Sequence, residues 1–281
     1  MSDITKIKII ADSSSDLNKL SKLSFASAAL KISTKEKEFV DDENLDTTQM
    51  VEYLLGYKGK SSSSCPNVND WFVAFGNAEE VYCVTITSNF SGSYNSAMLA
   101  KKQYEAKFPD RRVFVLDSLS TGPEMALILE KLEEFVLMGE SYDEITKKII
   151  EYSSQTGLMF MLESMQNLAN NGRVSPLTAK IAGVLGIRVV GRASDGGDLE
   201  TLNKCRGEGR ALSTIVDHLK EYGVKTGKVE IAHCLNENGA ISLKELINKS
   251  IPKAEVVIRK CGGLCSFYAE KGGLLVGYEK F

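Results

Sequence analysis

Histidine is nearly absent from this 281-residue sequence, and cysteine is sparse and scattered. There are two histidines, His218 and His233, and six cysteines. The only close cysteine pair, Cys261 and Cys265, is separated by three residues, whereas zinc sites typically separate such a pair by two. We therefore expect no metal site. Scattered cysteines also favour free thiols in a reducing, cytoplasmic protein.

An excess of charge of one sign is also missing. The sequence has 34 Lys and Arg against 37 Asp and Glu, for a formal net charge of −3. Because nucleic acids and anionic membrane surfaces bind basic faces, the composition predicts neither partner. No apolar stretch approaches the length of a membrane span, and the N-terminal residues lack the pattern of a signal peptide, so we expect neither segment.

The stretch most informative about function is VYCVTITSNFSGSYNSAMLA, residues 81–100. An apolar, β-branched run stops at a polar turn, and Ser91-Gly92-Ser93 opens a predicted helix. The first N–H groups of a helix point into such a turn and favour an anion there. Gly92 permits close approach of the backbone, and the Ser91 and Ser93 hydroxyls are uncharged donors for a carboxylate or phosphate. The alternative is a serine N-cap on an ordinary helix.

Two further strand-like runs end in polar loops. Residues 6–11 lead into DSSS at residues 12–15, and residues 111–116 lead into DSLST at residues 117–121. Strands alternate with helices in this half of the chain, which is typical of a parallel sheet with covered faces. Ligands bind such sheets at the carboxyl ends of the strands, so we expect the three loops to meet at one edge.

A run of four serines lies between these loops in the sequence. Residues 26–32 predict one strand, and the serine run, residues 61–64, predicts a short loop before Pro66. Composition alone also allows a flexible, low-complexity turn. Asn67 is placed to cap the helix that follows.

The pattern changes beyond residue 156. Residues 157–162, GLMFML, form an apolar strand that suits a core or the lining of an adaptable apolar cavity. The turn NNGRVS precedes a helix predicted over residues 177–185. It contains Arg173, whose guanidinium is either exposed, which is the commoner case, or directed inward.

The chain as a whole predicts an α/β protein of two domains. Residues 1–156 form the parallel-sheet domain with the anion-binding loops, and residues 157–281 form a mixed-sheet domain.

The order of motifs along the chain resembles that of the DegV family. The motifs are ADSSSDL, SSSSCPN, ITSNFSGSYNSA, VLDSLST, NNGRVS and a terminal GGLLVGYE. This family consists of lipid carriers that include the fatty-acid-binding subunit of bacterial fatty acid kinase. The resemblance implies a three-layer α/β/α domain with a parallel sheet and a two-layer domain with a mixed sheet. It also implies one long-chain fatty acid in a tunnel, with hydroxyls between the domains holding its carboxylate.

The same resemblance implies a set of carboxylate-binding residues. The head-group hydroxyl of the family falls on Ser63, and its Ser-Gly-Thr/Ser segment falls on Ser91, Gly92 and Ser93. Ser91 is then the carboxylate partner, with the next two amides nearby. The Gly-Arg-x-Ser segment is intact around Arg173.

The sequence departs from the family near its C-terminus. Where the family usually has His-Thr-Gly-Pro-Gly, residues 268–272 read YAEKG, so Tyr268 stands in the place of the histidine. We include Tyr268 as a candidate carboxylate-binding residue and expect altered details of head-group binding.

A fatty acid suits such a site on energetic grounds. Burying each methylene contributes about 0.8 kcal/mol, so a chain of roughly sixteen carbons offers on the order of 10 kcal/mol before ordering costs, against about 1 to 3 for a hydroxyl–carboxylate contact. Neutral donors also suit a carboxyl that is phosphorylated, because a fixed salt bridge would oppose the change of charge. We therefore predict a non-enzymatic carrier, without a cofactor beyond the bound fatty acid, that presents the carboxylate to a separate kinase subunit for acyl-phosphate formation.

Two other functions compete with this prediction. A serine-dependent hydrolase or acyltransferase needs a nucleophile and a base, but Gly-x-Ser-x-Gly is absent and the base would be His233 or His218. A kinase-like or phosphate-sugar-binding domain lacks a Gly-rich P-loop with its lysine. Acyl chain length, unsaturation, the identity of the kinase and the oligomeric state are left open, because tunnel shape is a tertiary property.

Overall fold

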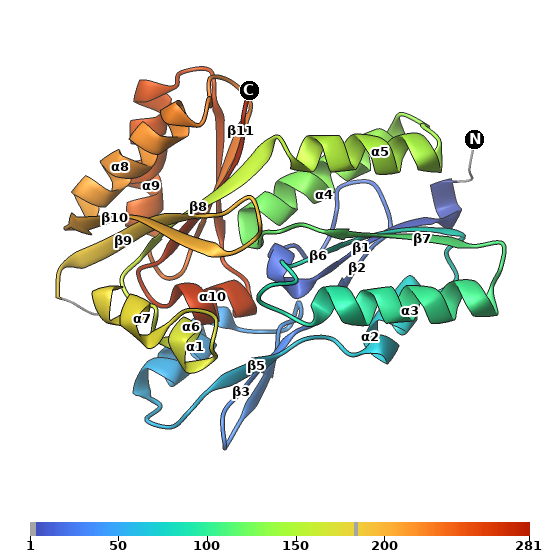
Figure 1. The fold of residues 1–281 in the computed structure, drawn as a ribbon, viewed down its shortest axis with the longest axis horizontal. Helices are drawn as coiled ribbons and strands as arrows, with labels where there is room; N and C mark the ends of the chain where they lie inside the picture. Colours follow the sequence, from blue (N-terminus) through green and yellow to red (C-terminus); the bar gives the residue numbers. More distant parts are fainter. Residues whose placement is uncertain (1–3, 183–184) are drawn as a thin grey trace.

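Three β-sheets organise the computed structural model, which describes residues 4–182 and 185–281 (Figure 1). The parallel sheet has the strand order β2-β1-β6-β7, the mixed sheet has the order β10-β9-β8-β13-β11-β12, and the small sheet has the order β4-β3-β5. Within the described ranges, no helix is long and apolar enough to cross a membrane.

The parallel sheet is covered by helices on both faces, as predicted. Its strands are β1 (Ile7–Asp12), β2 (Phe25–Ala28), β6 (Glu80–Thr85) and β7 (Arg112–Asp117), and all neighbours run parallel. Helices α2 (Val68–Phe75) and α3 (Ser93–Lys107) pack on one face, and α4 (Gly122–Leu137) and α5 (Tyr142–Ser153) pack on the other (Figure 1). Short 3₁₀ turns, η1 (Ile4–Lys6) and η2 (Ser13–Ser15), flank β1.

The small sheet corrects two predictions. The single strand expected over residues 26–32 is two strands, β2 and β3 (Lys31–Ser33), in different sheets. Between them the buried Leu30 amide donates to Ser13 Oγ at 3.0 Å. The serine run is not a loop but strand β5 (Ser62–Ser64), which pairs with β3 beside β4 (Glu38–Val40).

Two helices flank strand β5 of the small sheet along the chain. Helix α1 (Thr47–Gly56) precedes β5, and α2 follows it. Asn67 caps α2 with a complete capping box that includes Asp70, so that prediction is confirmed.

The mixed sheet is antiparallel except for one pair, β11 with β12. Its strands are β8 (Thr156–Leu162), β9 (Ile187–Ala193), β10 (Leu199–Arg206), β11 (Lys228–His233), β12 (Glu255–Lys260) and β13 (Leu274–Glu279). Helices α8 (Glu208–Glu221) and α9 (Glu237–Ser250) cover its outer face. Met159 and Met161 belong to this outer core.

The inner face of the mixed sheet packs on elements from both halves of the chain. These are α4, α6 (Gln166–Asn170), α7 (Pro176–Ala182) and α10 (Gly263–Ala269), together with β3 and α1. Helix α10 was not predicted, and residues 183–184 of the helix expected over 177–185 lie outside the described residues. Because β3 and α1 share a core with this sheet, the predicted division of the chain at 156/157 stays a prediction.

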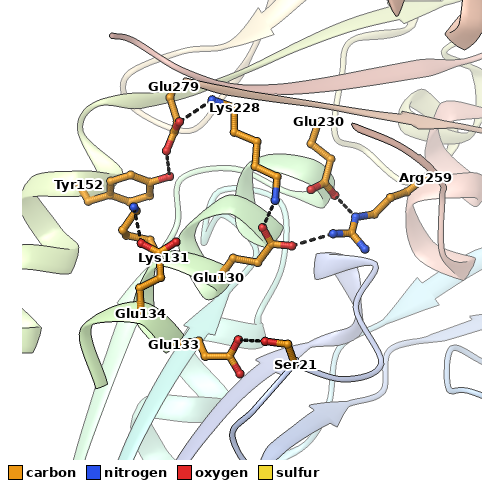
Figure 2. Close-up of polar contacts among 10 residues, drawn as sticks. All are labelled: Ser21, Glu130, Lys131, Glu133, Glu134, Tyr152, Lys228, Glu230, Arg259 and Glu279. Atoms are coloured by element: carbon orange, nitrogen blue, oxygen red, sulfur yellow. Dashed lines mark hydrogen bonds and ion pairs between the residues drawn. The ribbon is translucent and has the colours of Figure 1, made fainter. Parts of the chain in front are cut away.

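Charged side chains join α4 to the mixed sheet. Glu130 of α4 lies between Lys228 of β11 and Arg259 of β12, and accepts from Arg259 Nη2 at 2.7 Å (Figure 2). Arg259 Nε also pairs with the buried Glu230 at 2.7 Å. This network fixes α4 against the sheet and so positions the loop that precedes α4.

Two buried carboxyl groups make stability depend on pH. Burial raises the pKa of Glu124 from 4.5 to about 7, and burial also raises the pKa of Glu230 to about 7 although Arg259 opposes it. Because both values lie above the unfolded value, each contribution to stability is fully present below the unfolded pKa of 4.5 and is lost as the pH rises through about 7. We therefore expect the free energy of unfolding to fall between about pH 5 and about pH 8.

Replacing Glu124 with glutamine is expected to remove about 2 to 3 kcal/mol of this fall, because the amide oxygen still accepts from Thr156 Oγ1 but does not ionise. Urea unfolding at the two pH values measures the effect. Glu151→Gln, at a side chain that is 61% exposed, is the matched control and should leave the difference unchanged. An E124Q protein with the full wild-type difference would contradict this account.

Candidate ligand-binding site

A cavity of about 320 Å³ lies between the loops of the parallel sheet, the inner face of the mixed sheet and α10. Its volume falls within the range of small-molecule sites. Most of its lining is apolar, and the apolar lining residues are Leu30, Ile86, Phe90, Leu119, Leu158, Phe160, Leu162, Leu168, Ala193, Leu199, Leu264, Ala269 and Leu275.

Five of the six predicted carboxylate-binding residues line this cavity: Ser63, Ser91, Gly92, Arg173 and Tyr268. They come from β5, the β6–α3 loop, the α6–α7 turn and α10. The Tyr268 hydroxyl lies 2.7 Å from Ser63 Oγ, so the tyrosine in the place of the family histidine meets the predicted head-group serine. Burial raises the pKa of Tyr268, although Ser63 and Arg173 lower it. The phenol therefore keeps its proton at neutral pH and can donate a hydrogen bond.

Arg173 supplies a positive charge at the same end of the cavity. Its side chain is half-buried, its Nε donates to Phe90 O at 3.0 Å, and its Nη1 donates to Asn171 O. It pairs with no carboxylate in the part of the chain that the structure describes. The two carbonyl groups therefore orient the Arg173 guanidinium, and its positive charge is available to an anionic ligand.

The loop before α3 presents Ser91 to the cavity. Ser91 Oγ accepts from the Ser93 amide at 3.2 Å, which leaves its own O–H able to donate elsewhere. The N-cap residue of α3 is Gly92 rather than a serine, and Ser91, one residue earlier, bonds the first amide of the helix. A Cβ atom at residue 92 would lie 3.2 Å from Cys65 Sγ, so glycine suits this tight contact.

Ser93 has a different role from the direct one that we predicted. It is fully buried, it does not line the cavity, and its hydroxyl donates to Asp12 Oδ2 at 2.5 Å. Its hydroxyl is therefore occupied, and its predicted contact with a carboxylate stays a prediction. The geometry assigns Ser93 to holding the loop that carries Ser91.

Asp12 is the residue that the sequence analysis missed as an organiser of the site. This fully buried carboxylate accepts from Ser93 Oγ and also from the amides of Ile86, at 3.0 Å, and Ser14, at 3.2 Å. Burial raises its pKa, although these hydrogen bonds lower it. The loops after β1 and β6 therefore meet at one edge, as predicted. The sequence signal for Asp12 was its position as a polar residue at the end of a predicted strand. Its partners Ile86 and Ser93 could not be predicted, because they are distant in sequence.

The tip of the β9–β10 hairpin closes one side of the cavity. Thr87 Oγ1 donates to Gly197 O at 2.9 Å, and Asn89 Nδ2 donates to Gly196 O at 2.7 Å. Gly197 has φ +82°, and a Cβ atom there would lie 2.4 Å from Thr87 Oγ1, so this contact requires glycine. The hairpin tip and the loop after β6 are more than 100 residues apart, so no local pattern indicates this docking.

Neither histidine is among the described residues that line the cavity. His233 Nδ1 accepts from the Asn236 amide at 3.3 Å, and the His218 ring bonds Asn203 and Glu221. In residues 4–182 and 185–281, no group of three or more His, Cys, Asp or Glu side chains is arranged to hold a metal ion. All six cysteines are free. The histidine bases that a serine-dependent hydrolase would need therefore lie outside the described lining of this cavity.

The fold and the site define an α/β protein of three sheets with a mostly apolar cavity, whose polar lining includes hydroxyl groups and the guanidinium of Arg173. The chain belongs to the DegV family, whose sequence model, described as an uncharacterised protein family, matches residues 6–280.

Similar proteins agree with this assignment. A DegV domain-containing protein of Streptococcus pneumoniae is 42% identical over 276 residues, which are 97% of this chain and 98% of that protein. The S. pneumoniae fatty acid kinase (Fak) B3 protein loaded with linoleic acid is 41% identical, with a TM-score of 0.96 over 98% of this chain and 100% of that chain. A DegV family protein from Eubacterium eligens loaded with heptadecanoic acid matches with the same identity, TM-score and coverage. The predicted family and fold class are confirmed.

Proposed function

We propose that this protein binds one long-chain fatty acid and presents its carboxylate to a separate kinase subunit for acyl-phosphate formation, performing no chemistry itself. The observation that carries the proposal is a single cavity with an apolar body and a polar end made by Ser63, Ser91, Arg173 and Tyr268. The fatty acids bound by the similar proteins from S. pneumoniae and E. eligens support it.

The two parts of the cavity have different energetic roles. The apolar lining supplies affinity, since each buried methylene contributes about 0.8 kcal/mol. Ser91 and one hydroxyl of the Ser63–Tyr268 pair donate to the carboxylate and set the direction of the chain, while the other hydroxyl of that pair donates to its neighbour. The Gly92 and Ser93 backbone holds Ser91 in place.

The positive charge of Arg173 can balance the negative charge that phosphorylation of the ligand adds. Phosphorylation of the carboxylate increases the negative charge at the polar end of the cavity. A guanidinium held by backbone carbonyls and unpaired with any described carboxylate is available to this added charge, and its planar donors match phosphate oxygens. We place the protein in the cytoplasm, which suits its free thiols and a kinase that uses ATP.

The kinase step is tested by incubating the oleate-loaded protein with ATP and the fatty acid kinase subunit of the same organism, and then trapping acyl phosphate with hydroxylamine. We expect hydroxamate only when both proteins and ATP are present. Hydroxamate formed without the kinase subunit, or labelling of one serine by a fluorophosphonate probe, would instead support an enzyme.

Ser63→Ala and Tyr268→Phe are each expected to weaken oleate binding about 5- to 10-fold, because each removes one hydroxyl from the polar end. The double variant should lose less than the product of the two, since the hydroxyls contact each other. Isothermal titration of delipidated protein measures all three affinities. Wild-type affinity in both single variants would contradict this assignment.

A further inference from the structure

Three of the side chains at the polar end of the cavity come from elements that are far apart in the sequence. Ser63 lies on β5, Arg173 lies on the α6–α7 turn, and Tyr268 lies on α10. One carboxylate can meet all three only if the elements keep a fixed spacing, because hydrogen bonds depend steeply on distance and angle. The groups that fix this spacing therefore belong to the site even where they do not touch the ligand.

Two asparagine side chains of α6 and its C-cap join these elements. Asn167 and Asn171 are four residues apart, so they lie on one face of the helix. Asn171 Nδ2 donates to Ser61 O at 3.3 Å, directly before β5, and to Asn167 O at 2.9 Å. Asn167 Nδ2 donates to Phe267 O at 2.8 Å, next to Tyr268 on α10. The pair thus ties both β5 and α10 to α6.

The backbone of Asn171 holds the third element. Its carbonyl accepts from Arg173 Nη1, and the Arg173 amide donates to Leu168 O at 2.8 Å. Gly172, between them, has φ +74°, which glycine adopts without strain. The turn therefore closes onto α6, and a shift of Asn171 would move the Arg173 guanidinium.

A separate bond keeps α6 and α10 together when the Asn167 side chain is removed. Glu270, the C-cap residue of α10, accepts from the backbone amide of Asn167 at 3.0 Å. Glu270 has φ +55°, a conformation that costs a non-glycine residue free energy and persists where contacts hold it. Truncation of Asn167 should therefore loosen the spacing of the two helices without separating them.

We propose that Asn167 and Asn171 are positioning residues of the site, which set the spacing of the head-group side chains without touching the ligand. Neither is among the described residues that line the cavity. The inference rests on the proposed fatty acid binding. Hydrogen bonds to a carboxylate are directional, whereas burial of an acyl chain is not. Loss of either asparagine side chain should therefore reduce affinity for the carboxylate and spare affinity for the chain.

The test compares oleate with oleyl alcohol, which has the same chain and a neutral hydroxyl in place of the carboxylate. Dissociation constants are measured on delipidated protein by displacement of a fluorescent fatty acid. We expect Asn167→Ala and Asn171→Ala each to weaken oleate binding about 5- to 10-fold and oleyl alcohol binding less than about twofold. Asn170→Ala is the matched control on the same helix. Asn170 is exposed and its Oδ1 accepts only from Gln166 among the described residues, so both affinities should stay unchanged.

A double-mutant cycle tests the connection from Asn167 to Tyr268. Because Asn167 acts through α10, Asn167→Ala should weaken oleate binding by a smaller factor in a Tyr268→Phe protein than in the wild type. The same factor in both backgrounds would overturn the proposed role of Asn167.

The outcomes separate this inference from the proposed function. A wild-type protein that binds neither oleate nor oleyl alcohol overturns fatty acid binding. Oleate binding by the wild type, with substitutions that weaken both ligands equally or neither of them, overturns the positioning role alone.

Discussion

Replacing Ser91 with aspartate is expected to weaken fatty acid binding about 100-fold or more. Ser91 lines the polar end of the cavity, so the new carboxylate would lie beside the carboxylate of the ligand. Two like charges about 4 Å apart repel by about 4 kcal/mol at an effective dielectric constant of about 20. The residual attraction of Arg173 does not offset this repulsion, because the guanidinium would pair with the new aspartate.

Asn95→Asp is the matched control for this charge change. Asn95 is exposed in the first turn of α3 and does not line the cavity, so the same added charge should leave affinity for oleate within about twofold of wild type. Titration of delipidated proteins with oleate measures both variants. An S91D protein that binds oleate with wild-type affinity would contradict the placement of the carboxylate.

The second large effect is expected on stability. Asp12→Asn should lower the free energy of unfolding by about 3 kcal/mol, because an amide group would replace the oxygen that accepts from the Ile86 amide and the Ser93 hydroxyl. A donor would then face a donor inside the protein. The loop that carries Ser91 loses its anchor in the same step, so oleate affinity should fall as well.

Urea unfolding of the wild type, D12N and D143N measures this prediction. Asp143 has a side chain that is 88% exposed, so Asp143→Asn is the matched control and should change the free energy of unfolding by less than about 0.5 kcal/mol. A D12N protein as stable as the control would show that Asp12 does not organise the loops.

Much of the fold is visible in the sequence because local patterns dominate it. Alternation of strands and helices predicted the parallel sheet, and capping chemistry at Asn67 predicted the start of α2. The meeting of the strand-end loops also followed from topology, since the carboxyl ends of parallel strands lie at one edge. The Ser88 amide on Asp117 and the Thr87 amide on Ser120 O join two of these loops.

The remaining features depend on contacts between distant residues. Residues 62–64 form a strand only because β3 supplies the pairing partner, and four serines carry no strand pattern of their own. The apolar residues 157–162 were correctly predicted as a strand, but the methionines pack toward α8 and α9, while Leu158, Phe160 and Leu162 line the cavity. Which face of a buried strand meets a ligand is set by its neighbours.

In the site, too, some features were predicted from the sequence and others depend on contacts between distant residues. The resemblance to the DegV family implied Ser63, Ser91 and Arg173 as binding residues, and all three line the cavity. The departure from the family pattern at Tyr268 was also apparent in the sequence. The 2.7 Å contact between Tyr268 and Ser63 spans 205 residues, so no local pattern could indicate it. The bond from the Ser93 hydroxyl to Asp12 was not predicted for the same reason, because Asp12 lies 81 residues away.

The central claim, that the cavity holds one long-chain fatty acid, is tested most directly by organic extraction of the purified protein followed by mass spectrometry. We predict about one acyl chain per protein molecule, and uptake of added palmitate or oleate by any molecules that purify empty. A protein that yields no acyl chain and takes up neither fatty acid would contradict the account.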